Sequence, residues 1–200
     1  MSPKRFPLTV ILILAVIIWG GTLHALGIDL SWDYFKPYTY TLSALTILVT
    51  AFDQILWRYW PIHLFVKMPD LNGTWRVSLH STYIEQPIRG YAVVRQTYSM
   101  LSIRILTKDS SSALRASNIL VDPDQTYEIV GVYQSDPAIH LRGAESEIHY
   151  GSFKIRLVGS PVTSMKGHYW TDRSTKGTVE YTDRQWKHAD SFESAEKLFG

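Results

Sequence analysis

The segment from Gly167 to Gly177 gathers three kinds of side chain that together suit a nucleotide ligand. Aromatic rings can stack on bases, an arginine fork can hold phosphate oxygens, and hydroxyls can complete the hydrogen bonds. A polar hairpin with aromatic residues at its edge would show the same pattern, so both interpretations stay open. The side chains concerned surround one predicted hairpin: Tyr169, Trp170, Thr171, Arg173 and Thr175.

Arginines inside alternating stretches are a second candidate feature. Arg95 and Arg104 each lie within a period-two run, in which successive side chains face opposite sides of a strand. An arginine directed into a small barrel needs an anionic partner, and no carboxylate of matching parity lies in those runs. A ligand phosphate would meet this need, and solvent would meet it if that face points outward. The candidate ligand-binding residues are the five of the hairpin together with Arg76, Arg95, Tyr98, Arg104 and Tyr127.

Composition and missing motifs exclude several classes of function. The chain has 200 residues, a formal net charge of +2 and no cysteine, so thiolate zinc sites and cysteine nucleophiles are impossible. The P-loop, serine-hydrolase and zinc-protease signatures are missing, and the 7 histidines are scattered. We therefore expect no enzyme, no metal and no cofactor. The near-neutral charge also argues against a nucleic-acid polymer as partner, for which a basic stripe is expected.

The residues after Pro69 show the period-two alternation of short strands. Eight runs follow one another at intervals of about 8–14 residues, many of them bounded by turn signals. Eight antiparallel strands of this length suit a closed up-and-down barrel or a small sandwich over residues 68–183. We expect the compact barrel, which can hold one small ligand at its mouth. Residues 184–200 are predicted to form a helical tail, with Asp190 as the N-cap and Glu193 three residues on.

Residues 1–67 differ from the rest of the chain in charge and hydropathy. They hold only 5 of the 20 lysines and arginines and 3 of the 18 acidic residues. Apolar stretches at about 7–27 and 37–57 are each long enough to cross roughly 30 Å of hydrocarbon. Basic residues precede the first stretch (Lys4, Arg5) and follow the second (Arg58, Lys67). By the positive-inside rule, this predicts that both termini lie on the cytoplasmic side of the membrane. We therefore expect a transmembrane helical hairpin in a multi-pass membrane protein with a cytoplasmic barrel.

Two motifs carry a resemblance to a known family. Leu71–Arg76 (LNGTWR) opens the first strand, and Gly167–Gly177 (GHYWTDRSTKG) forms the hairpin described above. Together with two N-terminal spans, they make the chain resemble the CD-NTase-associated two-transmembrane β-barrel effectors of bacterial CBASS anti-phage systems. The resemblance covers nearly the whole chain in architecture, but it transfers no individual binding residue.

The resemblance implies a lipocalin-like barrel that binds a cyclic dinucleotide made by a partner nucleotidyltransferase during infection. Binding would promote oligomerisation, and the clustered transmembrane hairpins would disrupt the bacterial inner membrane and kill the phage-infected cell. No bond need be broken, so the implied protein is a sensor and effector and not an enzyme.

Two other functions fit the same sequence. A membrane-tethered lipocalin-like protein would bind a lipid or another hydrophobe, with apolar groups lining the mouth and the arginines outside. A constitutive membrane-protein subunit would use the barrel only to dock a partner. Substitution of Arg95 or Arg173 by alanine would discriminate among these functions, because only the nucleotide sensor needs an arginine for its ligand.

Overall fold

The computed structural model describes residues 8–27, 32–82, 86–142 and 147–200. The chain divides into two compact units, Met1–Leu56 and Trp57–Gly200. The first unit contains two helices, α1 (Leu8–Ala25) and α2 (Trp32–Gln54). A short 3-10 turn, η1 (Leu56–Arg58), and a single helical turn, α3 (Ile62–Phe65), come before the strands of the second unit.

The two N-terminal helices correct the membrane prediction. Among the described residues, no helix is both long enough and apolar enough to cross a bilayer. A span needs about 20 consecutive and mostly apolar residues, whereas α1 has 18 residues and the 23 residues of α2 include Asp33, Lys36 and Asp53. The predicted transmembrane hairpin is therefore wrong. The predicted multi-pass location in the inner membrane, on which the expected cytoplasmic termini and cytoplasmic barrel rest, is contradicted by the same finding.

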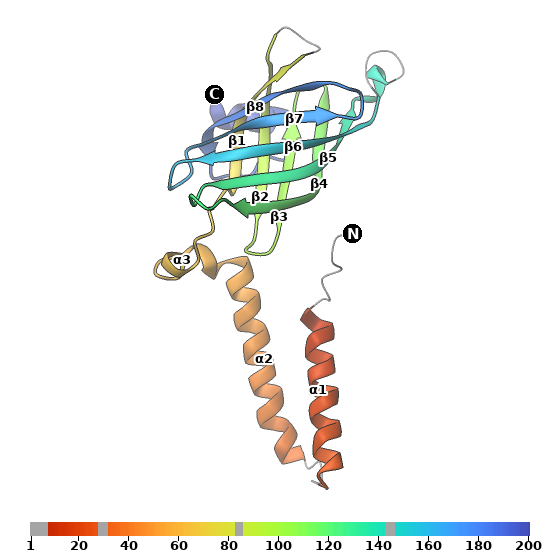
Figure 1. Cartoon of the computed structure of the whole chain (residues 1–200), viewed down its shortest axis with the longest axis vertical. Helices are drawn as coiled ribbons and strands as arrows, with labels where there is room; N and C mark the ends of the chain where they lie inside the picture. Colours follow the sequence, from red (N-terminus) through yellow and green to blue (C-terminus); the bar gives the residue numbers. More distant parts are fainter. Residues whose placement is uncertain (1–7, 28–31, 83–85, 143–146) are drawn as a thin grey trace. The chain divides into compact units, whose positions relative to one another are not determined.

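The second unit is a closed barrel of eight antiparallel strands, as the alternation predicts. Each strand pairs with the next along the chain, and β8 closes the barrel against β1. In Figure 1 the green to blue strands cross the front of the barrel, and the yellow to lime strands run behind them at a steep angle. The strands are β1 (Gly73–Ser81), β2 (Ile88–Gln96), β3 (Leu101–Leu106), β4 (Ser110–Val121), β5 (Tyr127–Pro137), β6 (His149–Val158), β7 (Ser164–Thr171) and β8 (Lys176–Gln185); a 3-10 turn, η2 (Ile139–Leu141), follows β5.

Alternation along each strand decides which side chains fill the barrel. On β1, Trp75 and Val77 are fully buried, while Arg76 between them is exposed. Burial of a large apolar side chain stabilises the fold by about 1.5–3 kcal/mol. Inward residues of seven strands form one buried core cluster, of which Ile129, Ile155 and Met165 are among the most buried. Strand β4 adds only the partly buried Leu114 and Ile119.

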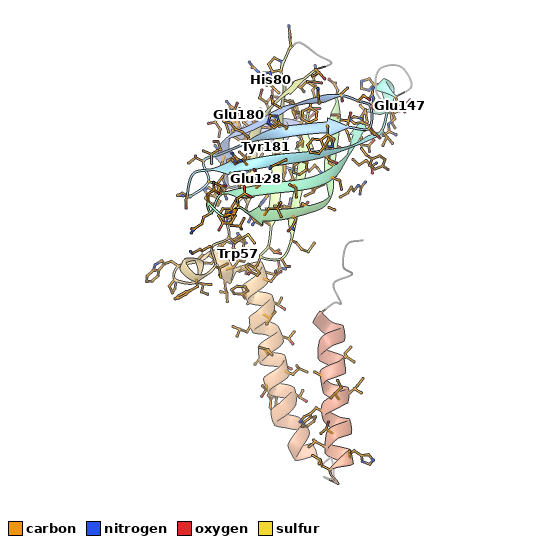
Figure 2. All side chains as sticks on the ribbon, in the orientation of Figure 1. Trp57, His80, Glu128, Glu147, Glu180 and Tyr181 are labelled. Carbon is orange, nitrogen blue, oxygen red and sulfur yellow. The ribbon has the colours of Figure 1, made fainter. Side chains whose placement is uncertain are left out.

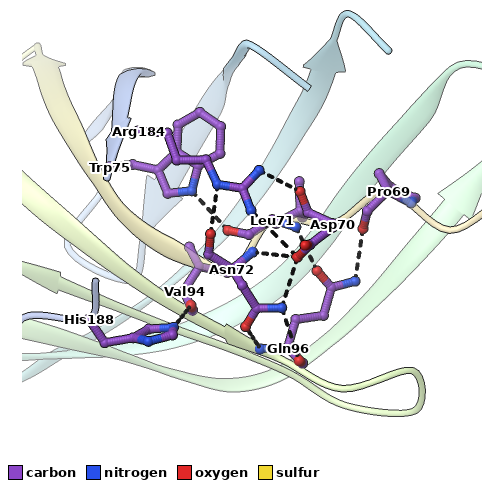
Figure 3. Close-up of polar contacts among 9 residues, drawn as sticks. All are labelled: Pro69, Asp70, Leu71, Asn72, Trp75, Val94, Gln96, Arg184 and His188. Carbon is purple, nitrogen blue, oxygen red and sulfur yellow. Dashed lines mark hydrogen bonds and ion pairs between the residues drawn. The ribbon is translucent and has the colours of Figure 1, made fainter. Parts of the chain in front are cut away.

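One end of the barrel is closed by a buried hydrogen-bond network (Figure 3). The Asn72 side chain donates to Asp70 Oδ1 (2.8 Å) and accepts from Gln96 N (2.8 Å). Arg184 donates through Nε to Asn72 O (2.7 Å), and its guanidinium lies 5.3 Å from the ring centre of Trp75. The Asn72 and Gln96 side chains find hydrogen-bond partners within the chain, while the buried Arg184 Nη2 has no hydrogen bond and lies 3.5 Å from Asp70 Oδ1. This end is therefore part of the core. We call it the closed end.

A C-terminal helix, α4 (Phe192–Phe199), packs on the outside of the barrel. Its buried Ala195 and the flanking Phe192 contact Val93 and Leu106, which point outward from β2 and β3. The helix is predicted, but its N-cap is Ser191 and not Asp190. Ser191 has an extended backbone and its hydroxyl accepts from Ser194 N (3.2 Å), which completes a capping box.

Candidate ligand-binding cavity

A cavity of about 820 Å³ lies within the barrel, toward the end opposite the closed end. All eight strands contribute to its lining, as do the β3–β4 and β7–β8 turns. We call the end that carries these turns the mouth. The volume lies within the roughly 300–1,000 Å³ of small-molecule sites. Figure 2 shows Tyr181, one of the lining residues, among the strands of the barrel.

The rim of the mouth is cationic. Arg89 of β2, Lys108 of the β3–β4 turn and Arg173 of the β7–β8 turn all line the cavity, with Asp109 as the carboxylate beside them. Within the described part of the chain, neither Arg89 nor Lys108 forms an ion pair. The rim therefore has a net positive charge, which favours the entry of anions.

Hydroxyl groups hold the β7–β8 turn in place at the rim. Thr171 Oγ1 and Thr175 Oγ1 share a hydrogen bond of 2.6 Å, and the backbone N–H of Arg173 donates to Thr171 Oγ1 (3.3 Å). On the other side of the cavity, Ser112 Oγ donates to Ser135 Oγ (3.2 Å). A hydroxyl has one donor and two acceptor positions, so these groups can also contact a ligand.

Aromatic rings form the walls, and glycines on neighbouring strands make room for them. Tyr133 lies opposite Gly151 in the β5–β6 ladder, and Tyr169 lies opposite Gly177 in the β7–β8 ladder. A Cβ on Gly151 would overlap the ring of Tyr133, and one on Gly177 would lie 2.7 Å from Tyr169 Oη. The Tyr133 ring also packs against Phe153, with 6.3 Å between the ring centres.

The phenols deep in the cavity are protonated at neutral pH. Burial raises the pKa of Tyr133 above its ordinary value of 10.0, and the neighbouring Tyr169 and Asp172 raise it further. Burial also raises the pKa of Tyr181, with a smaller contribution from Tyr133. A neutral phenol donates a hydrogen bond and presents its ring face, so these side chains can bind a ligand through both.

Four of the ten sequence-predicted site residues line this cavity: Tyr169, Thr171, Arg173 and Thr175. By alternation, Tyr169 and Thr171 are on the inward face of β7, and Arg173 and Thr175 lie in the β7–β8 turn. The same alternation directs Trp170 to the outside of the barrel, where it is 50% exposed. The predicted hairpin is thus divided between the cavity and the outer wall.

The three arginines predicted on other strands lie on the outer surface. Arg76, Arg95 and Arg104 are exposed, because their neighbours along each strand point into the core. Arg76 lies 3.4 Å from Asp183, and Arg95 lies 3.6 Å from Asp190. Asp183 belongs to β8 and Asp190 to the segment that follows β8. Alternation within the strands that carry Arg76 and Arg95 could therefore not reveal these two carboxylates.

The two remaining predicted residues lie away from the cavity lining. Tyr98, in the β2–β3 turn, faces the ring of the buried Trp57 at 6.5 Å between centres. Tyr127 Oη donates to the backbone oxygen of Lys67. A ligand-binding role for these tyrosines, for Trp170 and for the three outer arginines stays a prediction.

Sequence reasoning missed Arg89, Lys108 and Tyr133, all of which line the cavity. One signal was available for Lys108. In a barrel of consecutive antiparallel strands, every second turn lies at the same end, so the β3–β4 turn must share the mouth with the β7–β8 turn. Arg89 and Tyr133 have no such signal, because an inward or rim position depends on the tilt of the strands.

Nothing in the described residues suggests a metal centre, since no three His, Asp or Glu side chains among them are grouped to hold an ion. The rim instead combines cations with aromatic walls and hydroxyls. This donor set suits an organic anion with flat rings.

The family model of the Cap15 cyclic dinucleotide receptor domain matches residues 66–183, which include all of β1 to β7 and most of β8. The chain belongs to the Cap15 family. The predicted kinship with CD-NTase-associated CBASS effectors is therefore confirmed, and a cyclic dinucleotide is the ligand class for which the Cap15 receptor domain is described.

Three relatives carry the same protein name, CD-NTase-associated protein 15. The relative from Escherichia albertii is 24% identical over 198 residues, covering 90% of this chain and 95% of the relative. The relative from Staphylococcus schleiferi is 24% identical over 172 residues, covering 86% and 88%. The relative from Yersinia aleksiciae is 26% identical over 134 residues, covering 66% and 63%.

Proposed function

We propose that this chain is a CBASS effector that senses a cyclic dinucleotide in the mouth cavity of its barrel. The observation that carries the proposal is the combination, in one cavity of about 820 Å³, of a cationic rim and aromatic walls. A cyclic dinucleotide has two negative phosphodiesters and two flat bases, and so needs both. The proposed site residues are Arg89, Lys108, Tyr133, Tyr169, Thr171, Arg173 and Thr175.

Charge and stacking have separate tasks in this site. Arg173 and Arg89 would hold the phosphates, since guanidinium forks form charge-assisted hydrogen bonds to phosphate oxygens. Tyr133 and Tyr169 would stack on the bases, an interaction worth about 1–3 kcal/mol per base. Thr171 and Thr175 would accept or donate at the base edges or the ribose hydroxyls.

Ligand binding would act through assembly and not through catalysis. A ligand can shift an equilibrium between monomers and oligomers only if it binds the assembled form more tightly. We therefore propose that the cyclic dinucleotide promotes association of copies of this chain. The disruption of the inner membrane implied by the resemblance depends on the two spans and is not part of the proposal.

A hydrophobe-binding function has one observation in its favour. The deeper lining of the cavity is apolar and includes Ile103, Ile105, Leu114, Ile155 and Val179. A fatty acid could fill this part with its carboxylate at the cationic rim. The lipocalin-like function is therefore the second candidate.

The test is a thermal-shift screen of the full-length chain at fixed salt. The probes are cyclic di-AMP, cyclic di-GMP, cyclic GMP–AMP and cyclic di-UMP, with the linear dinucleotides and palmitate as comparisons. A ligand at 100 times its dissociation constant adds about 2.7 kcal/mol to the free energy of unfolding. A raised midpoint with one cyclic dinucleotide alone supports the proposal. A raised midpoint with palmitate alone would replace it by the hydrophobe-binding function.

A further inference from the structure

Strand β4 is paired on both sides for only part of its length. Strand β3 pairs with it through Arg104–Leu106 against Ser111–Ala113, whereas β5 pairs with it from Ser110 to Val121. A bulge lies just beyond the last residue pair with β3, and Arg115 in this bulge is not paired with any β5 residue in the ladder. Within the described residues, the edge of β4 from Leu114 to Val121 that faces β3 therefore has no partner strand.

Side-chain exposure agrees with an opening in the barrel wall at this edge. Ser117 and Val121 lie opposite Gly131 and Tyr127 of β5, so they belong to the inward set of β4. Both are nevertheless exposed, Val121 by 58%. An inward side chain on a closed wall would be covered, as Ile129 is on β5.

Beyond the bulge at Arg115, the composition of this edge lacks the usual protection against strand pairing. Natural edge strands carry lysine, proline or inward charges that prevent another strand from adding. Residues 116–121 read ASNILV, with no charge and no proline. An unprotected edge of this kind is suited to β-augmentation, in which a further strand adds through main-chain hydrogen bonds.

We propose that the free edge of β4 is the surface at which a second copy of this chain adds its own β4, antiparallel and about a two-fold axis. An axis near Asn118 puts Arg115 of each copy beside the Val121–Asp122 end of the other. Arg115, the only cation of β4, then lies near Asp122 of the other copy. The two-fold axis produces this contact twice, as an isologous interface requires. This charge complementarity favours a second copy over an unrelated peptide.

The edge is connected to the proposed ligand cavity, and in this respect the inference rests on the proposed function. Ile105 and Ser112 face each other across the β3–β4 seam, and both line the cavity. Leu114, where the free edge begins, lines it as well. A ligand that contacts these residues holds the two strands at a set separation and thereby orders the edge for a partner strand.

Cross-linking tests the edge directly, because the chain has no cysteine of its own. Asn118→Cys puts a thiol on the proposed axis, where opposed Cβ atoms are about 4.5–5.5 Å apart. The matched control is His168→Cys, at an exposed outward position of β7, a strand that is paired on both sides. We expect a covalent dimer of the full-length chain from Asn118→Cys under mild oxidation, with more of it in cyclic dinucleotide. Equal yields from both variants, or none from Asn118→Cys, would overturn the inference.

Charge variants separate the interface from ligand binding. Leu120→Lys and Arg115→Glu should each lower the dimer fraction in sedimentation at least tenfold, and Arg115→Glu combined with Asp122→Arg should restore it. The thermal shift with the cyclic dinucleotide should persist in all of them, smaller than in the unmodified chain only by the part that association adds to binding. Wild-type dimerisation in Leu120→Lys would overturn the inference while leaving the proposed function intact. If the unmodified chain shows no thermal shift with any of the cyclic dinucleotides, this result counts against the proposed function.

Discussion

Arg173 lies in the turn between β7 and β8, at the cationic rim of the mouth. In the proposed site its guanidinium binds a phosphate, and a hydrogen bond to a charged group contributes about 1.5–3 kcal/mol. We therefore predict that Arg173→Ala weakens cyclic dinucleotide binding roughly 10- to 150-fold. Titration calorimetry on the full-length chain measures this change. The melting temperature without ligand should stay the same, since an exposed turn side chain adds little to stability.

Arg95 and Lys166 provide the comparison for Arg173. Both are exposed on the outer wall, where Arg95 faces Asp190 and Lys166 faces Glu180 at 2.6 Å. If the cavity is the ligand site, Arg95→Ala and Lys166→Ala should bind with unchanged affinity. A loss of affinity in Arg95→Ala alone would instead move the site to the outside of the barrel.

Gly151 leaves space that the ring of Tyr133 occupies. We predict that Gly151→Ala pushes this ring into the cavity and weakens ligand binding. The overpacking should also lower the free energy of unfolding by about 1–3 kcal/mol. Denaturant unfolding and titration calorimetry measure the two effects. Adding Tyr133→Ala to Gly151→Ala should recover part of the lost stability but none of the lost affinity, and recovery of both would contradict a stacking role for Tyr133.

Helix α4 depends on its N-terminal cap, because eight residues are too few for a helix to be stable alone. Removing a serine cap costs about 1 kcal/mol. We predict that Ser191→Ala lowers the free energy of unfolding by about that amount, whereas Asp190→Ala changes it by less than about 0.5 kcal/mol. Thermal or denaturant unfolding distinguishes the two. A loss of about 1 kcal/mol from Asp190→Ala with little change from Ser191→Ala would mean that Asp190 caps the helix, as the sequence alone suggests.

The stability of the whole barrel should depend on Glu128 at acidic pH. Its side chain is 4% exposed and contacts Lys154 Nζ (2.7 Å) and Arg156 Nη2 (3.0 Å) across the β5–β6 ladder; Figure 2 labels it. The hydrogen bond from Lys154 lowers the pKa of Glu128 below its ordinary 4.5, and Arg156 adds to this effect. The ionised form therefore stabilises the fold above about pH 4.5, and this stabilisation disappears as the pH falls through the lowered pKa.

We predict that unfolding experiments between pH 7 and pH 3 show a smaller loss of stability for Glu128→Gln than for the unmodified chain. At pH 7 the variant should be the less stable of the two, because the amide cannot form the two ion pairs. Parallel curves for the two proteins would show that Glu128 titrates normally in the folded state. Glu180→Gln, whose partner Lys166 lies on an exposed surface, is the matched control.

The barrel could be predicted from the sequence because its information is local. Alternating side chains and turn residues define each strand within about ten positions, and a chain of eight such strands has few ways to bury its inward faces. The C-terminal helix follows from the same kind of local pattern. The N-terminal helices show the limit of this reasoning: their apolar composition suggests two spans, but α1 ends after 18 residues and α2 contains charged residues.

The sequence alone therefore determined the eight short strands, the C-terminal helix and the kinship with the CD-NTase-associated effectors. Only the tertiary structure decided which candidates share a cavity. Tyr169 and Arg173 meet Arg89 and Tyr133 there, while Arg76, Arg95 and Arg104 face solvent. The physical reason is that alternation gives two sets of side chains per strand, but closure and tilt of the barrel choose the inward set. These long-range properties are absent from any single stretch of sequence.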